Sequence, residues 1–408
     1  MKRLRLLESA LAGAGAVWLV GSGNWPTAPA AADRDYVTAI APSTLAQDLA
    51  RRFGGRAFVM DESRQYWRLV APQLPMVDLA PVAGGDIGHD LSLRDFTMNA
   101  VAAYLPAHRP LLDPFLGLTD LRHGLVRQVS AQSLPADPLR VLRGLRLASE
   151  HAFVIESCTW SAMRTAAPGL QDVKPERIRM ELLRALQGAG WIRAALACSD
   201  LDLWTHLPLV PVLAVDRQAL ECRLGNLARS APAARSAAER IGGMRGLDHS
   251  RAGGLAVLAA VCLAGARDGD GARRMGEQLR FSAREIAALA GMVAGAADMG
   301  TDVIGRRRAY ALVERYGAAA AWSAALAANS SFLDSVANLR LPDLSLIPDG
   351  RALAAAVGRP PGPWLGPVVD HLRRLVALGE LDPERGPQEA VAWTEKARQR
   401  GAPSQRRE

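Results

Sequence analysis

The chain has 408 residues, a formal net charge of +8 at pH 7 and a sequence pI near 9.8. Its composition, 49% hydrophobic and 22% charged, excludes wholesale disorder, and no apolar run approaches the ~20 residues that a membrane helix needs. The four cysteines lie far apart without a CxxC pair, which argues against a zinc site or a disulfide framework. The positive charge suits a polyanionic partner such as RNA, although a basic protein without such a partner explains the charge almost equally well.

The N-terminal stretch has two incompatible interpretations. One is a secretory signal, with a basic start at residues 1–5, an apolar middle and small residues at 28–32 where a peptidase could cut. The other is a buried strand over 16–20, a Gly-Ser turn at 21–22 and an Asp-x-Asp pair at 33–35. The first interpretation removes the stretch from the mature protein, and the second makes it the active site.

Strand and helix signals alternate through the rest of the first third. Short apolar runs predict strands of one sheet at 36–40, 57–60, 66–70 and 76–79. A helix is predicted between the first two, capped by Thr44 and ended by Gly54-Gly55, because apolar residues recur on one face. From Leu91 through Ala103 the spacing predicts another helix, and after about Leu139 almost everything is helical. The sequence therefore predicts a small mixed α/β head followed by a long helical body, an α+β protein.

Acidic and small residues in this first third are candidates for phosphate chemistry. The Gly21-Ser22 turn lets the backbone approach a phosphate closely, and the serine can donate a hydrogen bond. On a strand, Asp33 and Asp35 point to the same face, where their charges repel unless a divalent cation such as Mg²⁺ lies between them. Asp78 is a lone acid in an apolar strand and could complete a triad that deprotonates a hydroxyl. Taken one at a time, solvated strand ends explain these acids as well.

Four longer blocks follow in a fixed order. They are DLSLRDFTMNAVA (90–102), DPFLGLTDLRHGLVRQV (113–129), ADPLRVLRGLRLASEHAFVI (136–155) and ERIRMELLRAL (176–186). Together they strongly resemble the successive motifs of the class II tRNA nucleotidyltransferases (CCA-adding enzymes) and their bacterial poly(A) polymerase relatives. The opening stretch then matches the first motif of that family, and residues 358–381 are more weakly similar to its tail.

The resemblance implies a fold and an activity. The fold is α+β, with a polymerase-β-like mixed-sheet head at 1–128, an elongated helical neck with a base-reading motif at 129–195, a degenerate HD-like helical body at 196–330 and an RNA-binding helical tail at 331–408. The activity is template-independent addition of C and/or A to tRNA 3′ ends by two-metal phosphoryl transfer. CTP and/or ATP would be the substrates, two Mg²⁺ ions the cofactors, and tRNA, held at its 3′ end and elbow, the partner. Neither a membrane nor DNA is expected.

The resemblance also implies roles for acidic and nucleotide-binding residues. Asp33 and Asp35 would hold two Mg²⁺ ions, and Asp78 would help to activate the RNA 3′-hydroxyl. The turn at Gly21 and Ser22 would approach phosphate. Contacts to the ribose and triphosphate would come from Arg94 and Asp95, with Asn99 in support.

Base recognition would fall to the first helix of the neck. Asp137 and Arg140 would hydrogen-bond the base edge, and they lie one helical turn apart, so both side chains can reach the same base. Arg143 and Arg146 continue this face and could meet phosphate, although a solvated arginine stripe is the more frequent case. The Glu176-Arg177 pair would brace the base-reading helix.

The sequence departs from the family pattern at several places, among them a shorter, alanine- and proline-rich loop before Asp33 and Arg34 between the two aspartates, where an apolar residue is usual. The family's Gly-Gly-x-Val-Arg-Asp reads GSGNWP at 21–26, so an arginine that helps to hold the triphosphate is missing. Ala136 stands in place of a glutamate, and the short segment between Asp78 and Asp90 leaves no room for the family's longer flexible loop. Family members with a shortened loop include CC-adding enzymes. The changes are therefore consistent with a partial activity, such as the addition of C alone.

Three alternatives accompany this prediction. The chain could be a poly(A) polymerase, or a catalytically weakened tRNA- or RNA-binding relative, as the missing arginine and Trp25-Pro26 suggest. It could also be a secreted helical protein. Glu8 interrupts the apolar core of the supposed signal, and cleavage would remove the strand and turn that the later motifs require. We therefore predict that the stretch is retained and that the protein is cytoplasmic.

Overall fold

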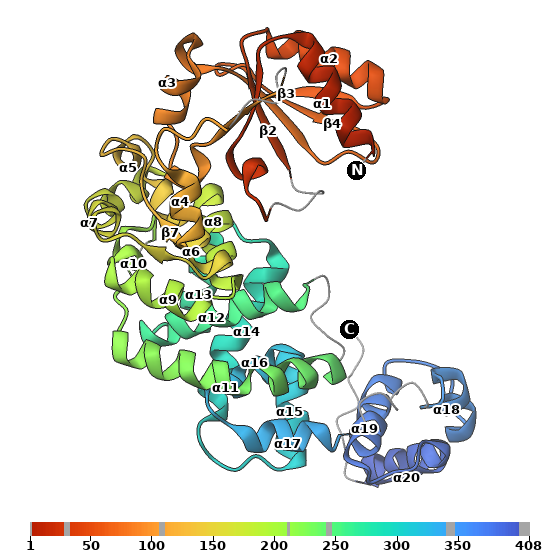
Figure 1. The fold of residues 1–408 in the computed structure, drawn as a ribbon. Helices are drawn as coiled ribbons and strands as arrows, with labels where there is room; N and C mark the ends of the chain where they lie inside the picture. Colours follow the sequence, from red (N-terminus) through yellow and green to blue (C-terminus); the bar gives the residue numbers. More distant parts are fainter. Residues whose placement is uncertain are drawn as a thin grey trace. The chain divides into compact units, whose positions relative to one another are not determined.

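The computed structural model describes residues 2–27, 33–105, 111–209, 213–241, 247–339 and 347–399. The chain divides into two compact units, Met1–Pro208 and Leu209–Glu408 (Figure 1). In the described ranges no helix is both long and apolar enough to cross a membrane. The boundaries at 128, 195 and 330 stay predictions.

A six-stranded mixed sheet forms the N-terminal half of the first unit. Its strands are β1 (Val17–Val20), β2 (Arg34–Thr38), β3 (Arg56–Asp61), β4 (Tyr66–Val70), β5 (Val77–Pro81) and β6 (Ala102–Tyr104), in the order β3-β4-β5-β2-β1-β6. Only β2 and β5 pair in parallel; the other pairs are antiparallel. The strand predicted at 16–20 thus lies inside the sheet, between β2 and β6, and the other four predicted strands are confirmed with ends shifted by a few residues.

Two helices cover one face of this sheet. These are α1 (Lys2–Ala14) and α2 (Pro42–Phe53), which lie beside each other in Figure 1. Leu7 and Leu11 of α1 and Leu49 of α2 are almost fully buried there, in one apolar core with alternate residues of the strands. The first residues of the chain are therefore part of the head core.

The helix α2 begins and ends for identifiable reasons. Gly54 ends it in the left-handed conformation (φ 65°), as predicted, because glycine adopts that conformation without steric cost. The predicted cap at Thr44 is wrong: Ala41 is the N-cap and Pro42 the first helical residue, where its missing N–H is not needed.

The predicted helix from Leu91 through Ala103 is also wrong. The chain instead forms α3 (Ile87–Ser92), a 3₁₀ turn at Thr97–Asn99 and then β6. The backbone of Ala102 bonds with Leu112, and Ala102 pairs with Val20 of β1. Strand pairing satisfies the backbone hydrogen-bonding groups of this segment. The helical spacing of a few apolar residues therefore did not indicate a helix here.

Helices make up most of the rest of the first unit. They are α4 (Gly117–Arg122), α5 (Ser133–Ala136), α6 (Leu139–His151), α7 (Ser157–Ala166), α8 (Pro175–Gln187), α9 (Trp191–Asp200) and α10 (Leu203–His206), with a two-stranded sheet of β7 (Leu125–Val126) and β8 (Val154–Ile155). The helices α6 and α8 pack along each other, and leucines of both, such as Leu142 and Leu182, are fully buried.

The second unit is helical throughout the ranges that the structure describes. Its elements are α11 (Arg217–Ile241), α12 (His249–Ala264), α13 (Gly269–Gln278), α14 (Ala283–Met299), α15 (Arg306–Tyr316), α16 (Ala319–Leu326), α17 (Ser330–Ala337), α18 (Gly350–Val357), α19 (Leu365–Leu378) and α20 (Gly386–Gln399). The last three share a small core of their own around Leu353, Val368 and Leu372. The predicted α+β class, a mixed-sheet head followed by helices, is confirmed.

Candidate active site

The turn after β1 brings backbone close to a carboxylate. Residues Gly21–Asn24 form a 3₁₀ turn, and the Asn24 amide fixes it by donating to the carbonyls of Leu19 (2.9 Å) and Val101 (3.0 Å). Gly21 has φ +69°, and a Cβ there would lie 3.6 Å from Asp35 Oδ2. The left-handed backbone conformation therefore favours glycine, whereas a Cβ at this distance from the carboxylate would make only an ordinary van der Waals contact.

Trp25, which departs from the family pattern, has a structural role. It is 8% exposed, its indole N–H donates to the Met98 carbonyl (2.8 Å), and its ring meets His151 edge-on at 5.0 Å. The residue after the turn thus anchors the turn to the neck helix α6.

Asp35 and Asp78 are neighbours on the parallel strands β2 and β5. The Asp78 carboxylate is fully engaged: Arg68 donates to it from Nε (2.7 Å) and Nη2 (2.8 Å), and the Tyr66 hydroxyl donates at 2.6 Å. Among the described residues, none donates a hydrogen bond to Asp35 or forms an ion pair with it. Burial, and then the Asp78 charge, raise the pKa of Asp35. Of these two carboxylates, Asp35 is therefore the one without an ion-pair partner among the described residues.

The donor set fits a metal only in part. Asp33 is exposed, immediately precedes β2, and adds its own smaller repulsion to the raised pKa of Asp35. In the described ranges no three His, Cys, Asp or Glu side chains are grouped so that they could hold a metal ion. Asp33 and Asp35 can supply two hard oxygen ligands beside substrate phosphates, whereas both Asp78 oxygens are already bound. The structure does not assemble the predicted triad of Asp33, Asp35 and Asp78.

A pocket of about 550 Å³ opens beside Asp35. It is lined by Gly21, Ser22, Asp35, Arg64, Asp90, Leu93, Arg94, Asp95, Asn99, Arg140 and Arg143. Eight of these residues are among the predicted site residues. Sequence reasoning missed Arg64, Asp90 and Leu93.

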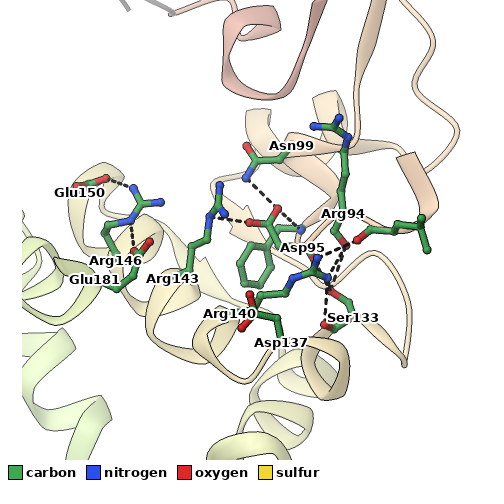
Figure 2. A network of polar contacts seen from close by, with 12 residues as sticks. Arg94, Asp95, Asn99, Ser133, Asp137, Arg140, Arg143, Arg146, Glu150 and Glu181 are labelled. Atoms are coloured by element: carbon green, nitrogen blue, oxygen red, sulfur yellow. Dashed lines mark hydrogen bonds and ion pairs between the residues drawn. The ribbon is translucent and has the colours of Figure 1, made fainter. Parts of the chain in front are cut away.

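Asp95 is the buried centre of the polar network in Figure 2. It is 5% exposed and accepts from the Phe96 amide (2.8 Å) and the Asn99 side chain (3.1 Å), while Arg143 Nε lies 2.8 Å from its other oxygen. Burial alone would raise the pKa of Asp95, but Arg143, the Phe96 amide and Asn99 outweigh it and lower the pKa. Asp95 is therefore a fixed negative charge that orients Arg143 at the pocket.

Arg94 reaches the pocket from the loop after α3. Its Nη2 lies 2.8 Å from Asp90 Oδ1, and Asp90 also accepts from the Ala83 amide. The i,i+4 spacing of Asp90 and Arg94 is a sequence signal that could have identified Asp90 as its partner. Arg64 lies between β3 and β4, where the sequence carries no such signal.

The predicted base-reading pair is engaged within the protein. Arg140 donates to the carbonyls of Leu93 (2.9 Å), Arg94 (3.2 Å) and Ser133 (3.0 Å), as Figure 2 shows in part. Asp137 lies outside the pocket lining, and its Oδ2 accepts from Arg177 at 2.9 Å. The contact with Arg177, a residue of α8, holds Asp137 in an extended segment just before α6, which begins at Leu139.

Arg146 lies outside the pocket lining. It is 7% exposed, with Nε 2.6 Å from Glu181 and Nη1 2.6 Å from Glu150 (Figure 2). The predicted phosphate contact is therefore not available to it, because its guanidinium joins α6 to α8.

Two segments match known family descriptions. Residues 43–127 match "Poly A polymerase head domain", and residues 152–213 match "Probable RNA and SrmB- binding site of polymerase A". The chain is 41% identical over 155 residues to the CC-adding tRNA nucleotidyltransferase of Geobacter sulfurreducens, covering 38% of this chain and 36% of that protein. It is 36% identical over 192 residues to the A-adding tRNA nucleotidyltransferase of Deinococcus radiodurans, covering 45% and 43%. The matched segments thus span less than half the length of these curated relatives.

Solved structures extend the likeness of fold to nearly the whole chain. The Thermotoga maritima CCA-adding enzyme complexed with tRNA superposes with a TM-score of 0.74 at 20% identity, over 96% of each chain. A CCA-adding enzyme complexed with CTP gives 0.74 at 20% identity, over 97% of this chain and 95% of that one. The matched segments are thus similar to those of tRNA nucleotidyltransferases and poly(A) polymerases, and the fold is that of the solved CCA-adding enzymes.

Proposed function

We propose that the protein is a template-independent RNA nucleotidyltransferase that adds C and/or A to the 3′ ends of tRNA. The observation that carries this proposal is the pocket in which the Gly21-Ser22 turn, Asp35, Arg94 and Arg143 meet. These residues come from separate motifs and face one space large enough for a nucleotide. The relatives named above are CC-adding and A-adding enzymes, which favours the same substrates, CTP and ATP, for this chain.

The pocket offers donors to a triphosphate. Arg94 and Arg143 each have one carboxylate partner, Asp90 and Asp95, which fixes the guanidinium and leaves other N–H groups for phosphate oxygens. Arg64, whose side chain is 84% exposed and whose Asp61 partner is 3.7 Å away, adds a further charge to the lining. Arg64 would compensate for the arginine that is missing from the first motif.

Asp33 and Asp35 would hold Mg²⁺, shared with the phosphates of the nucleotide. When bound, the metal supplies Lewis-acid activation of the phosphate and neutralises developing charge. Asp35 suits this role because it is partly buried and lacks a cationic partner in the described structure. Asp78 would accept the proton of the RNA 3′-hydroxyl at Oδ2, which requires Tyr66 or Arg68 to give up its hydrogen bond there.

Base recognition by Asp137 and Arg140 requires a similar exchange. Arg140 would release at least one backbone carbonyl to meet the base edge, and Asp137 would release Arg177. Both exchanges replace one charge-assisted hydrogen bond by another, so nucleotide binding can drive them without a large net cost. The tail at 331–408 would contact the tRNA elbow, and the reaction would take place in the cytoplasm without DNA or a membrane.

The test is incorporation of labelled CTP and ATP into tRNA that ends before the first C, after CC, or after CCA. Transfer of C to the first, or of A to the second, supports the proposal, and the product lengths distinguish CC, A and CCA addition. Long A tracts without dependence on tRNA would favour the alternative, a poly(A) polymerase. Binding of tRNA without any incorporation would refute the proposal and favour the weakened RNA-binding relative.

A further inference from the structure

The outer part of the sheet, formed by β3 and β4, differs on its two faces. Alternate residues such as Ala57 and Leu69 pack into the core beneath α1 and α2. The residues between them point the other way: Phe58 is 44% and Val70 is 50% exposed, and both lie across from arginines. We call this set, Arg56, Phe58, Arg68 and Val70, the β3–β4 face.

This face is continuous with the candidate active site. The register places Phe58 opposite Arg68, Arg68 opposite Asp78, and Asp78 opposite Asp35, on four adjacent strands. Neighbouring strands are ~4.8 Å apart, so Phe58 lies about 14 Å across the sheet from Asp35.

Most of the nucleotide pocket lies on the other side of Asp35. Apart from Arg64 at the hairpin tip, its lining comes from the turn after β1, from residues 90–99 and from α6. In-line phosphoryl transfer places the attacking hydroxyl opposite the leaving pyrophosphate. If the pocket holds the triphosphate, as the proposed function requires, the acceptor end must approach Asp35 from the side of β5 and β4.

We propose that the β3–β4 face docks the last unpaired nucleotides of the RNA acceptor. A base would stack on Phe58, and Arg56 and Arg68 would contact the backbone phosphates, since exposed aromatic rings interleaved with arginines suit single-stranded RNA. A phosphate bound to Arg68 competes with Asp78 for the same guanidinium. Docking of the acceptor therefore favours release of Asp78, the group proposed to accept its proton.

The test compares Phe58→Ala with Val59→Ala in the full-length protein. Val59 is a matched control, because it is the adjacent residue of β3, 43% exposed, and pairs with Trp67 rather than Arg68. With CTP and tRNA ending before the first C, Phe58→Ala should raise KM for tRNA by roughly 5-fold or more, in line with loss of one stacked base. KM for CTP should change less than 2-fold, and Phe58→Trp should restore KM for tRNA. Equal tRNA KM values for Phe58→Ala and Val59→Ala would overturn the proposal.

A binding experiment separates this proposal from the proposed function. The same tRNA, carrying a photoreactive 4-thiouridine as its last nucleotide, is cross-linked without CTP. Weaker 3′-terminal cross-linking of Phe58→Ala than of Val59→Ala supports docking even if the wild type transfers no nucleotide. Equal cross-linking overturns docking even if transfer is efficient. Light scattering that shows a wild-type dimer dissolved by Phe58→Ala would identify the face as a contact between copies, and would also overturn the proposal.

Discussion

Replacing Asp95 by asparagine removes the charge at the centre of the pocket network while keeping its shape. The new amide oxygen can still accept from the Phe96 N–H, but its NH₂ group would face the Arg143 guanidinium, donor against donor. A hydrogen bond to a charged group, such as those from the Phe96 amide and the Asn99 side chain to Asp95, contributes ~1.5–3 kcal/mol. The ion pair with Arg143 adds less, because that side chain is 47% exposed and partly screened by water. We expect Asp95→Asn to lower the free energy of unfolding by about 2 kcal/mol.

The assay is a double-mutant cycle in urea, with Asp95→Asn, Arg143→Met and the double variant followed by circular dichroism. The interaction free energy from the cycle should be about 1–2 kcal/mol, because either single substitution already breaks the contact between the two side chains. A coupling below about 0.5 kcal/mol would refute the claim that this pair organises the pocket.

The same variant has a defined pH dependence. The folded-state pKa of Asp95 is lowered, so its contribution to stability is fully present above the unfolded pKa of ~3.9 and is lost as the pH falls below it. The Asp95→Asn variant lacks this contribution at every pH. The difference in free energy of unfolding between wild type and variant should therefore be largest above pH 5 and small below pH 4. A gap that widens on acidification would contradict the assigned sign.

Two further substitutions test other parts of the site, each with a control. Arg64→Ala should raise KM for the nucleotide about 3- to 10-fold in steady-state transfer, because one exposed charged contact is lost. Arg51→Ala breaks a similar exposed ion pair on α2 and should leave KM unchanged. Equal effects of the two substitutions on KM would contradict the role of Arg64. Gly117→Ala should lower the melting temperature strongly or prevent folding, because its Cβ would lie 1.9 Å from the Thr97 carbonyl oxygen, whereas Gly13→Ala meets nothing within 4 Å and should be neutral or slightly stabilising. A soluble Gly117→Ala protein with the melting temperature of the wild type would show that the backbone at Gly117 does not lie this close to the Thr97 carbonyl.

Local patterns predicted much of the head correctly. Short apolar runs located the strands, and Gly54 marked the end of α2, because these signals act within a few residues. The motif order brought Asp35, Arg94 and Asp95 to one pocket, as the resemblance implied. Helical spacing failed near Ala103 because pairing with a distant strand, β1, determines that backbone.

The partners of charged side chains were harder to predict. Asp78 is bound by Arg68 because the register of β4 against β5 places them opposite each other, and that register is not readable from either segment alone. Arg143 and Arg146 are three residues apart on α6, yet one meets Asp95 and the other Glu181. The difference depends on what packs beside the helix, which spacing does not specify.

The most direct test of the account is transfer by a variant that carries both Asp33→Ala and Asp35→Ala. We predict that labelled CTP and ATP are no longer joined to tRNA that lacks its 3′ end, while tRNA binding stays within a few-fold of the wild type. Transfer at the wild-type rate by this variant would show that the chemistry does not depend on these two carboxylates, and the assignment of the active site would be wrong.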